Sequence, residues 1–234
     1  MGGSAREALN LIFDADDTLW DSNIHFLEAF DEFVAACGRS GLEIGLDGIK
    51  TAVRDAELDL IRTLGYGRRP YVLALHRAAD ALVHNGEGNF LHAEIDRIGG
   101  HLIERHCALL PDVGPTLQEL AGRHTLLLLT KGQRDEQLGK LQRSGLADLF
   151  SRVETPHEKD IDAYRRLIVD ADLHPELTWM IGNSPRSDIN PAVRAGIRAV
   201  FIPHSHTWDL EHEELVESER IVELDGFRRL LELF

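Results

Sequence analysis

The pattern of apolar residues predicts an α/β fold. After residue 111, short apolar runs alternate with amphipathic segments, which is typical of parallel strands connected by helices. One further apolar run, at 9–13, lies near the N-terminus, and the chain from Ile24 to Cys107 shows only helical periodicity. We therefore expect a doubly wound, Rossmann-like parallel sheet, formed by residues 1–22 and 110–234. An all-helical cap at 23–109 is expected as an insertion after the first strand.

Each expected element has its own local pattern. In the insertion, Phe26, Ala29, Phe30 and Phe33 repeat at helical spacing, and three further stripes of this kind predict four helices in all. Elsewhere, short runs rich in Leu, Ile and Val predict six strands, at 9–13, 124–129, 149–153, 177–181, 199–202 and 221–224. Amphipathic helices are expected between these strands, at 135–144, 160–171 and 188–195.

The charge balance disfavours two classes of partner. Forty acidic residues against 25 basic residues give a formal net charge of −15, which repels nucleic acid and anionic membranes. A small anionic substrate remains compatible with this charge, because charges beyond about 8 Å are largely screened at physiological salt. No apolar run approaches the roughly 20 residues that span a bilayer, and residues 1–6 do not resemble a signal peptide. The expected location is the cytoplasm.

Polar side chains stand at the carboxyl ends of four of the predicted strands. The carboxyl ends of parallel strands meet at one edge of an open sheet, so side chains that are distant in sequence converge there. The candidate site residues are Asp14 and Asp16 after the first strand, Thr130, Lys131 and Gly132 after the second, Lys159 after the third, and Asn183 and Asp188 after the fourth.

These residue types suit phosphate chemistry. Asp14 and Asp16 can divide the work between an attacking nucleophile and an acid that protonates the leaving oxygen. Oxygen ligands from the first and fourth strand ends are the kind that Mg²⁺ binds. The hydroxyl of Thr130 and the nearby backbone amides can hold phosphoryl oxygens, and Lys159 supplies a cation that offsets the carboxylates.

Taken together and in this order, the four motifs resemble those of the haloacid dehalogenase-like hydrolases that carry a small helical cap, over essentially the whole chain. The resemblance implies that Asp14 is the aspartyl nucleophile and Asp16 the acid/base residue, whose backbone carbonyl also binds magnesium. It further implies a phosphate-binding role for Thr130, a catalytic lysine at Lys159 and metal ligands at Asn183 and Asp188. The function that follows is magnesium-dependent hydrolysis of a small phosphorylated metabolite through a phospho-aspartyl intermediate.

Three alternatives stay open within this resemblance. A 2-haloacid dehalogenase would use the same aspartyl attack on carbon, but it needs neither magnesium nor a second carboxylate, so Asp16 argues against it. A phosphomutase would pass the phosphoryl group to another hydroxyl instead of water. A magnesium-binding or phosphate-binding relative without turnover is suggested only by Asn183, where many relatives carry aspartate.

Five further residues have two interpretations each. His204 and His206, with His212 nearby, could share a zinc ion, but the sequence offers no third ligand at a suitable spacing, and structural hydrogen bonds are expected instead. Arg68 and Arg69 are expected as a surface pair, with contact to a substrate anion as the alternative.

Two residues beside the first motif are also expected to be structural. Asp17 is expected to be a solvated or helix-capping carboxylate rather than a catalyst, and Trp20 is expected to pack where the cap begins.

Overall fold

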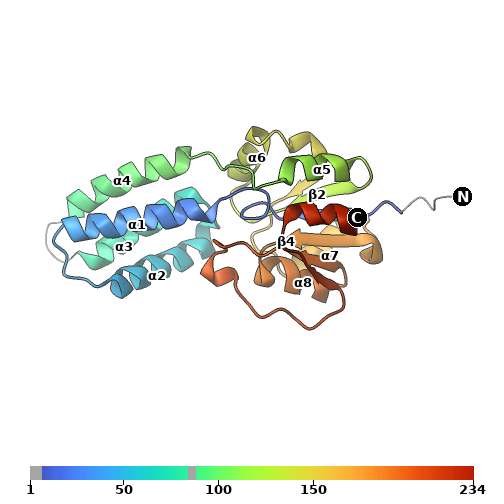
Figure 1. Cartoon of the computed structure of the whole chain (residues 1–234). Helices are drawn as coiled ribbons and strands as arrows, with labels where there is room; N and C mark the ends of the chain where they lie inside the picture. The colour runs from blue at the N-terminus through green and yellow to red at the C-terminus, as the bar shows by residue number, and fades with distance from the viewer. Residues whose placement is uncertain (1–6, 84–87) are drawn as a thin grey trace, which may run out of the picture. The chain divides into compact units, whose positions relative to one another are not determined.

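The computed structural model describes residues 7–83 and 88–234 (Figure 1). Residues 1–6 lie outside this range, and with them the expectation about a signal peptide. The chain divides into two compact units: a core domain of Met1–Asn23 and Cys107–Phe234, and a cap domain of Ile24–His106. None of the helices in the described part of the chain is both long enough and apolar enough to cross a membrane.

The core domain is built on a sheet of six parallel strands, which confirms the predicted α/β fold. The strands are β1 (Asn10–Phe13), β2 (Thr125–Leu129), β3 (Phe150–Glu154), β4 (Thr178–Gly182), β5 (Arg198–Phe201) and β6 (Ile221–Glu223). Their spatial order is β3-β2-β1-β4-β5-β6, so β1 is flanked by β2 and β4. The chain therefore winds outward from β1 in both directions, and the carboxyl ends of β1, β2 and β4 lie next to one another.

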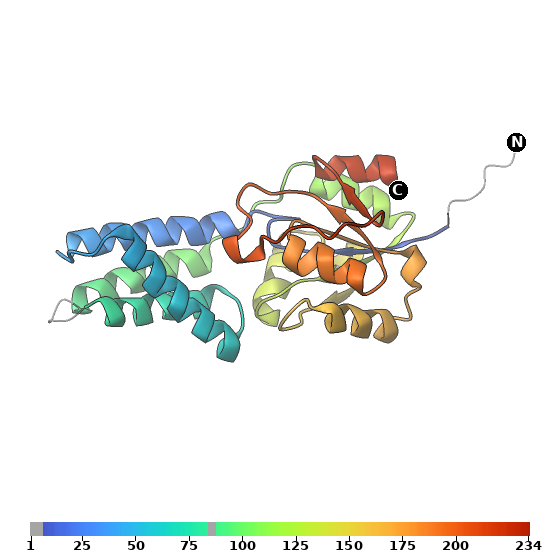
Figure 2. The same ribbon diagram turned by 90° about the horizontal axis from the view of Figure 1, so that it is seen from below.

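Helices cover both faces of this sheet (Figure 2). Side chains alternate across a strand, so Leu11 and Phe13 of β1 face one layer and Ile12 faces the other. The first layer contains α5 (Val113–Ala121), α6 (Arg134–Arg143) and α9 (Leu230–Leu233). The second contains α7 (Ile161–Asp170) and α8 (Asn190–Arg194). The central strands β1, β2 and β4 are thus buried on both sides, as their continuous apolar runs predict, whereas the edge strands β3 and β6 are only partly buried.

One predicted helix differs from the structure. A single helix at 188–195 was expected, but Pro185–Ile189 forms one π-helical turn and α8 begins only at Asn190. Pro191 lies in the first turn of α8, where its missing N–H costs no hydrogen bond. Turns of the π type are often found beside functional sites, and this one contains Asp188.

The cap domain consists of four helices, the number predicted: α1 (Asn23–Arg39), α2 (Leu46–Leu64), α3 (Arg68–Leu82) and α4 (Gly88–Glu104). Their apolar faces form a core of their own around side chains such as Phe33, Leu75 and Ile95.

The expectation of a surface pair at Arg68 and Arg69 is wrong for Arg68 and right for Arg69, which is exposed. Only 3% of Arg68 is exposed, and its guanidinium donates hydrogen bonds to the carbonyls of Ile103 and Arg105. These carbonyls lie at the C-terminal end of α4, where the last turn of a helix lacks partners of its own. Arg68 therefore closes a helix of the cap domain, and this use of its donors leaves no support for a substrate contact.

Candidate active site

Three of the predicted site residues meet at the carboxyl ends of β1 and β4. Asp14 follows β1 directly, and its backbone N–H donates to the carbonyl of Ile181, 2.9 Å away in β4. The Nζ atom of Lys159 lies 2.5 Å from Oδ1 of Asp14 and also contacts Oδ1 of Asp188. Asp14 is 6% exposed, Lys159 3% and Asp188 0%, so both carboxylates share one ammonium group away from water.

This arrangement carries one more negative charge than positive. Burial raises the pKa of Asp14 to about 7 against the opposing charge of Lys159, and it raises the pKa of Asp188 as well. For Lys159, burial favours the neutral form, but the two carboxylates outweigh it and raise the pKa of the ammonium group. A divalent cation would relieve the excess of negative charge at this place.

The residues present fit a magnesium ion, because the donor set consists of oxygens. Asp14 and Asp188 would hold the ion, together with the backbone carbonyl of Asp16 and the amide oxygen of Asn183. Asn183 is buried, and its Oδ1 accepts a hydrogen bond from Thr18 at 3.1 Å while its Nδ2 donates to Thr207 at 2.7 Å. The hydroxyl of Thr207 donates its proton to the carbonyl of His204 at 3.0 Å, so it can only accept from Asn183, and this sets which amide atom faces Thr18.

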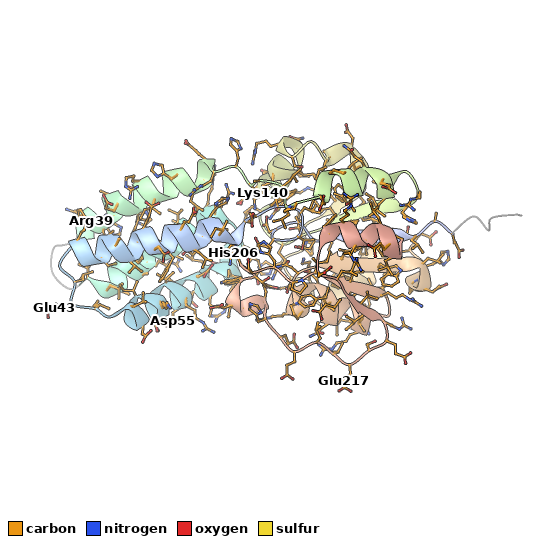
Figure 3. The ribbon with its side chains drawn as sticks, viewed as in Figure 1. Arg39, Glu43, Asp55, Lys140, His206 and Glu217 are labelled. Atoms are coloured by element: carbon orange, nitrogen blue, oxygen red, sulfur yellow. The ribbon has the colours of Figure 1, made fainter. Side chains whose placement is uncertain are left out.

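The carboxylate of Asp16 is surrounded by donors. Trp20 donates from Nε1 to Oδ1 at 2.6 Å, and Gln137 donates from Nε2 to Oδ2 at 2.8 Å. Lys140, labelled in Figure 3, places its Nζ 2.9 Å and 3.0 Å from the two oxygens. Burial opposes ionisation, but Lys140 and the other two donors outweigh it and hold the pKa of Asp16 below its ordinary value.

Gln137 and Lys140 are parts of the site that the sequence reasoning missed. Both lie on α6 and are buried, together with Leu141. Positions three and four residues apart share one face of a helix, so Lys140 stands in the apolar stripe of an amphipathic helix. A lysine at such a position needs a buried anion, and this was the signal in the sequence.

Asp17 and Trp20 have structural contacts. Oδ1 of Asp17 accepts the backbone N–H groups of Ser22 and Asn23 at 2.9 Å and 3.0 Å, so Asp17 caps the start of α1. The capping interpretation is confirmed, but the carboxylate is buried rather than solvated, and burial raises its pKa to about 7. Trp20 is buried in the core of the domain and also positions Asp16.

The segment after β2 contains a buried threonine and a glycine with a positive φ. Thr130 is 1% exposed, and Gly132 has a φ of +111°, a conformation that side chains other than glycine rarely adopt. A Cβ atom at Gly132 would lie 3.0 Å from Nε2 of Gln137, the group that holds Asp16. Glycine at this position therefore keeps the donor shell of Asp16 intact.

A family model for haloacid dehalogenase-like hydrolases matches residues 10–196, which include all eight candidate site residues. The chain belongs to this family. The resemblance noted in the sequence is thereby confirmed.

Proteins similar to this hydrolase include a phosphatase and a dehalogenase. A phosphoserine phosphatase from Thermus thermophilus is 35% identical over 104 residues, which make up 42% of this chain and 42% of the relative. A haloacid dehalogenase-like family hydrolase from Xanthomonas campestris has a TM-score of 0.80 and 27% identity, covering 97% of this chain and 91% of the other. A 2-haloacid dehalogenase from Pseudomonas syringae pv. Tomato has a TM-score of 0.62 and 20% identity, covering 97% and 98%. The last comparison shows a shared fold only.

A largely buried glutamate, whose side chain is 13% exposed, joins two loops of the hydrolase site. Oε1 of Glu211 lies 2.5 Å from Nζ of Lys131, and Oε2 accepts a hydrogen bond from Oγ of Ser184 at 2.6 Å. Lys131 also donates to Oγ of Ser187 at 3.0 Å. Glu211 therefore connects the loop after β2 to the loop after β4, and the ammonium group of Lys131 is engaged there. Sequence reasoning missed Glu211, because the segment between β5 and β6 has no periodic pattern.

Replacing Glu211 with Gln is expected to lower stability at neutral pH by up to about 3 kcal/mol. Burial opposes ionisation of Glu211, but Lys131 and the serine hydroxyls lower its pKa from 4.5 to about 2. Because the folded-state pKa is depressed, the stabilisation is present above about pH 4.5 and is lost as pH falls toward 2. Urea unfolding at several pH values from 7 to 3 should therefore show a difference between the two proteins that shrinks with acid.

The matched control is Glu158→Gln. Glu158 lies 3.8 Å from the same ammonium group, but its side chain is 45% exposed, so its removal should change stability by well under about 1 kcal/mol. A Glu211→Gln difference that stays constant with pH would show that the charge of Glu211 is not what stabilises the two loops.

Gly182, the last residue of β4, has no room for a side chain. A Cβ atom there would lie 2.2 Å from Oδ2 of Asp188. That oxygen accepts the backbone N–H of Ser184 at 2.9 Å, which holds Asp188 against the strand. The absence of a side chain at Gly182 is thus what lets Asp188 reach Lys159.

Proposed function

We propose that this hydrolase is a magnesium-dependent phosphatase that acts on a small phosphorylated metabolite through a phospho-aspartyl intermediate. The observation that carries the proposal is a pair of unlike carboxylates two residues apart. Asp14 is buried against Lys159, whereas the side chain of Asp16 is 31% exposed and held by neutral and cationic donors. The phosphoserine phosphatase relative supports a phosphate monoester as the substrate class. The cytoplasmic location stays a prediction.

The proposed reaction has two half-reactions. In the first, a carboxylate oxygen of Asp14 attacks phosphorus, the bond from phosphorus to the ester oxygen breaks, and Asp16 gives a proton to the leaving oxygen. In the second, Asp16 takes a proton from a water molecule that attacks phosphorus, which releases inorganic phosphate and restores Asp14. Bound magnesium supplies positive charge that draws the phosphoryl oxygens toward Asp14.

Other side chains would orient the phosphoryl group. Thr130 offers its hydroxyl, Lys131 and Gly132 offer their backbone amides, and Lys159 offers its ammonium group. The side chain of Lys131 is not included among these groups, because its ammonium group already binds Glu211.

The donors around Asp16 affect the two half-reactions differently. They favour the ionised carboxylate, which is the form that activates water. To protonate a leaving oxygen, Asp16 must first bind a proton, and the ammonium group of Lys140 opposes this. We therefore expect Lys140 and Gln137 to release Asp16 when substrate is bound.

Three measurements separate this proposal from its alternatives. Phosphate release from an aryl phosphate and from a panel of phosphate monoesters is measured with and without magnesium, chloride release is measured from a 2-haloacid, and the products formed from sugar phosphates are identified. Magnesium-dependent phosphate release supports the phosphatase. Chloride release without magnesium would identify a dehalogenase, a product that is an isomeric sugar phosphate would identify a mutase, and no turnover of any phosphate monoester would favour a binding protein.

Replacing Asn183 with Asp is expected to tighten the apparent magnesium affinity, because it adds a negative charge to an oxygen donor set. The substitution loses the hydrogen bond from Nδ2 to Thr207, so a small loss of stability accompanies the gain. Magnesium titrations of activity measure the effect, and Asp188→Asn, which removes a charge, should shift the titration in the opposite direction. An unchanged or weaker affinity in Asn183→Asp would show that Asn183 is not a ligand.

A further inference from the structure

Three side chains of the core domain that the proposed reaction does not use form a compact cluster. They are Asp21, which follows the first motif, and His204 and His206, which follow β5. One ligand atom from each lies within 4.8 Å of the other two, and Oδ1 of Asp21 is 3.1 Å from Nε2 of His204. Sequence spacing did not reveal this third ligand, because Asp21 and the histidines come together only through the parallel arrangement of β1, β4 and β5.

The backbone that carries the two histidines is held in place. The carbonyl of His206 accepts a hydrogen bond from Nδ2 of Asn23 at 2.6 Å, and the carbonyl of His204 accepts from the hydroxyl of Thr207 at 3.0 Å. The same hydroxyl accepts from Nδ2 of Asn183 at 2.7 Å. These hydrogen bonds hold the loop in one conformation without a ligand, so little conformational entropy remains to be lost when a ligand binds.

One ring nitrogen of the cluster, Nδ1 of His206, is buried and lacks a hydrogen-bond partner among the described residues. By contrast, Nε2 of His204 has Asp21, and Nε2 of His212 contacts the carbonyl of Thr207 at 3.3 Å. The expectation of structural hydrogen bonds thus holds for His204 and His212, and His206 is the ring that it leaves unexplained.

We propose that Asp21, His204 and His206 bind one divalent d-block cation, with Zn²⁺ as the preferred ion. Two imidazole nitrogens and one carboxylate oxygen suit zinc, whereas magnesium prefers oxygen ligands only. The 3.1 Å between Asp21 and His204 matches two ligand atoms that are each about 2.0 Å from one ion. His204 is 14% exposed and Asp21 37%, so the site is open enough for water to complete a tetrahedral shell.

Binding requires a change of tautomer at His204 but no net proton transfer to or from that ring. In the structure, Nε2 faces Asp21 while Nδ1 accepts the backbone N–H of His206 at 3.3 Å. When Nε2 binds the metal, the proton of the neutral ring moves to Nδ1, which lies 3.9 Å from Oδ1 of Asp17. A carboxylate behind a metal-bound histidine is a common supporting arrangement, and the carboxylate of Asp17 stands on that side of the ring.

The cap domain contains a second pair of histidines that a zinc experiment must distinguish. Nδ1 of His76 lies 2.7 Å from Nδ1 of His92, and the other ring nitrogens contact Asp96 and Asp80. This pair offers only two imidazoles to an ion, since its carboxylates lie at the far side of each ring. It serves as the reference for histidines outside the proposed site.

The test is a zinc titration of the full chain by calorimetry, with magnesium present at saturating concentration to occupy the oxygen donors around Asp14. We expect one tight Zn²⁺ per chain, zinc X-ray absorption with scattering from two imidazoles, and a rise in melting temperature with zinc. Asp21→Asn and His206→Gln should each weaken the affinity at least about tenfold, because even supporting residues of metal sites contribute 10- to 100-fold. Asp21 is partly exposed, so Asp21→Asn tests the ligand without threatening the fold.

Two histidine variants are the matched controls. His212→Gln alters the same loop without removing a ligand, and His76→Gln removes an imidazole from the pair in the cap domain. Both should keep the tight zinc site. The proposal is overturned if zinc binds with oxygen ligands only, if Asp21→Asn binds zinc as tightly as the wild type, or if His76→Gln alone removes the tight site. None of these outcomes depends on whether the enzyme is a phosphatase.

Discussion

Asp14→Asn is expected to reduce turnover by roughly 10⁴-fold or more, since an amide cannot replace the carboxylate as nucleophile. Stability should change by less than about 1 kcal/mol, for a reason that the structure supplies. Two carboxylates share the ammonium group of Lys159, so Asp188 still pairs with it after Asp14 is neutralised. The substitution removes a charge from a buried cluster that has one negative charge too many.

Activity and stability have to be measured on the same preparation. Acid-quenched samples of the wild type, incubated with a ³²P-labelled substrate, should contain a covalent phosphoenzyme, and those of Asp14→Asn should not. Urea unfolding shows whether the variant is folded. A folded variant that keeps more than a few per cent of the wild-type rate would be incompatible with attack by Asp14.

Asp16→Ala is expected to slow both half-reactions by roughly 10²- to 10⁴-fold each, the usual contribution of a positioned acid or base. The loss in the transfer step should depend on the leaving group. An aryl phosphate with an acidic phenol needs little protonation and should lose less than an alkyl phosphate, which departs as a strongly basic alkoxide. This dependence separates an acid from a residue that only holds the site together.

The comparison requires transfer rates from single-turnover kinetics, because hydrolysis of the phosphoenzyme is common to both substrates. Asp17→Asn is the matched control: it neutralises the adjacent carboxylate but keeps an oxygen that can accept the N–H groups at the start of α1, so the difference between aryl and alkyl substrates should stay as in the wild type. Equal losses for both substrates in Asp16→Ala would remove Asp16 from the acid role.

Most of the fold and part of the site geometry could be predicted from the sequence for one physical reason. A parallel sheet buries its strands on both faces, so each strand is a continuous apolar run, and the first polar residue after the run marks the edge where ligands bind. This logic placed Asp14, Lys159 and Asp188 together, and the structure brings them into contact. The helices of the cap domain followed from apolar stripes in the same way.

The other contacts could not be predicted because they depend on how side chains from different segments pack against one another. The positions of the strand ends do not specify this packing. Glu211 reaches Lys131 from a segment without regular structure. Arg68 stood next to the exposed Arg69 in a polar, glycine-containing segment, yet it is buried against the end of α4. The role of Lys140 could have been predicted from the sequence, because a charged residue within the apolar stripe of α6 requires an explanation.

The contact between Gly182 and Asp188 limits how this site can evolve. Any side chain at position 182 would overlap the carboxylate at position 188, so the effect of a substitution at one position depends on the residue at the other. A Cβ atom at position 182 would also lie 2.7 Å from the Cβ atom of Asp188, so alanine at position 182 requires glycine at position 188 or a shift of the backbone, and a chain with both changes has lost a charge next to Lys159. Substitutions at position 182 are therefore expected to be selected against as long as Asp188 is retained. In relatives, a change at position 182 is expected to occur together with a change at position 188.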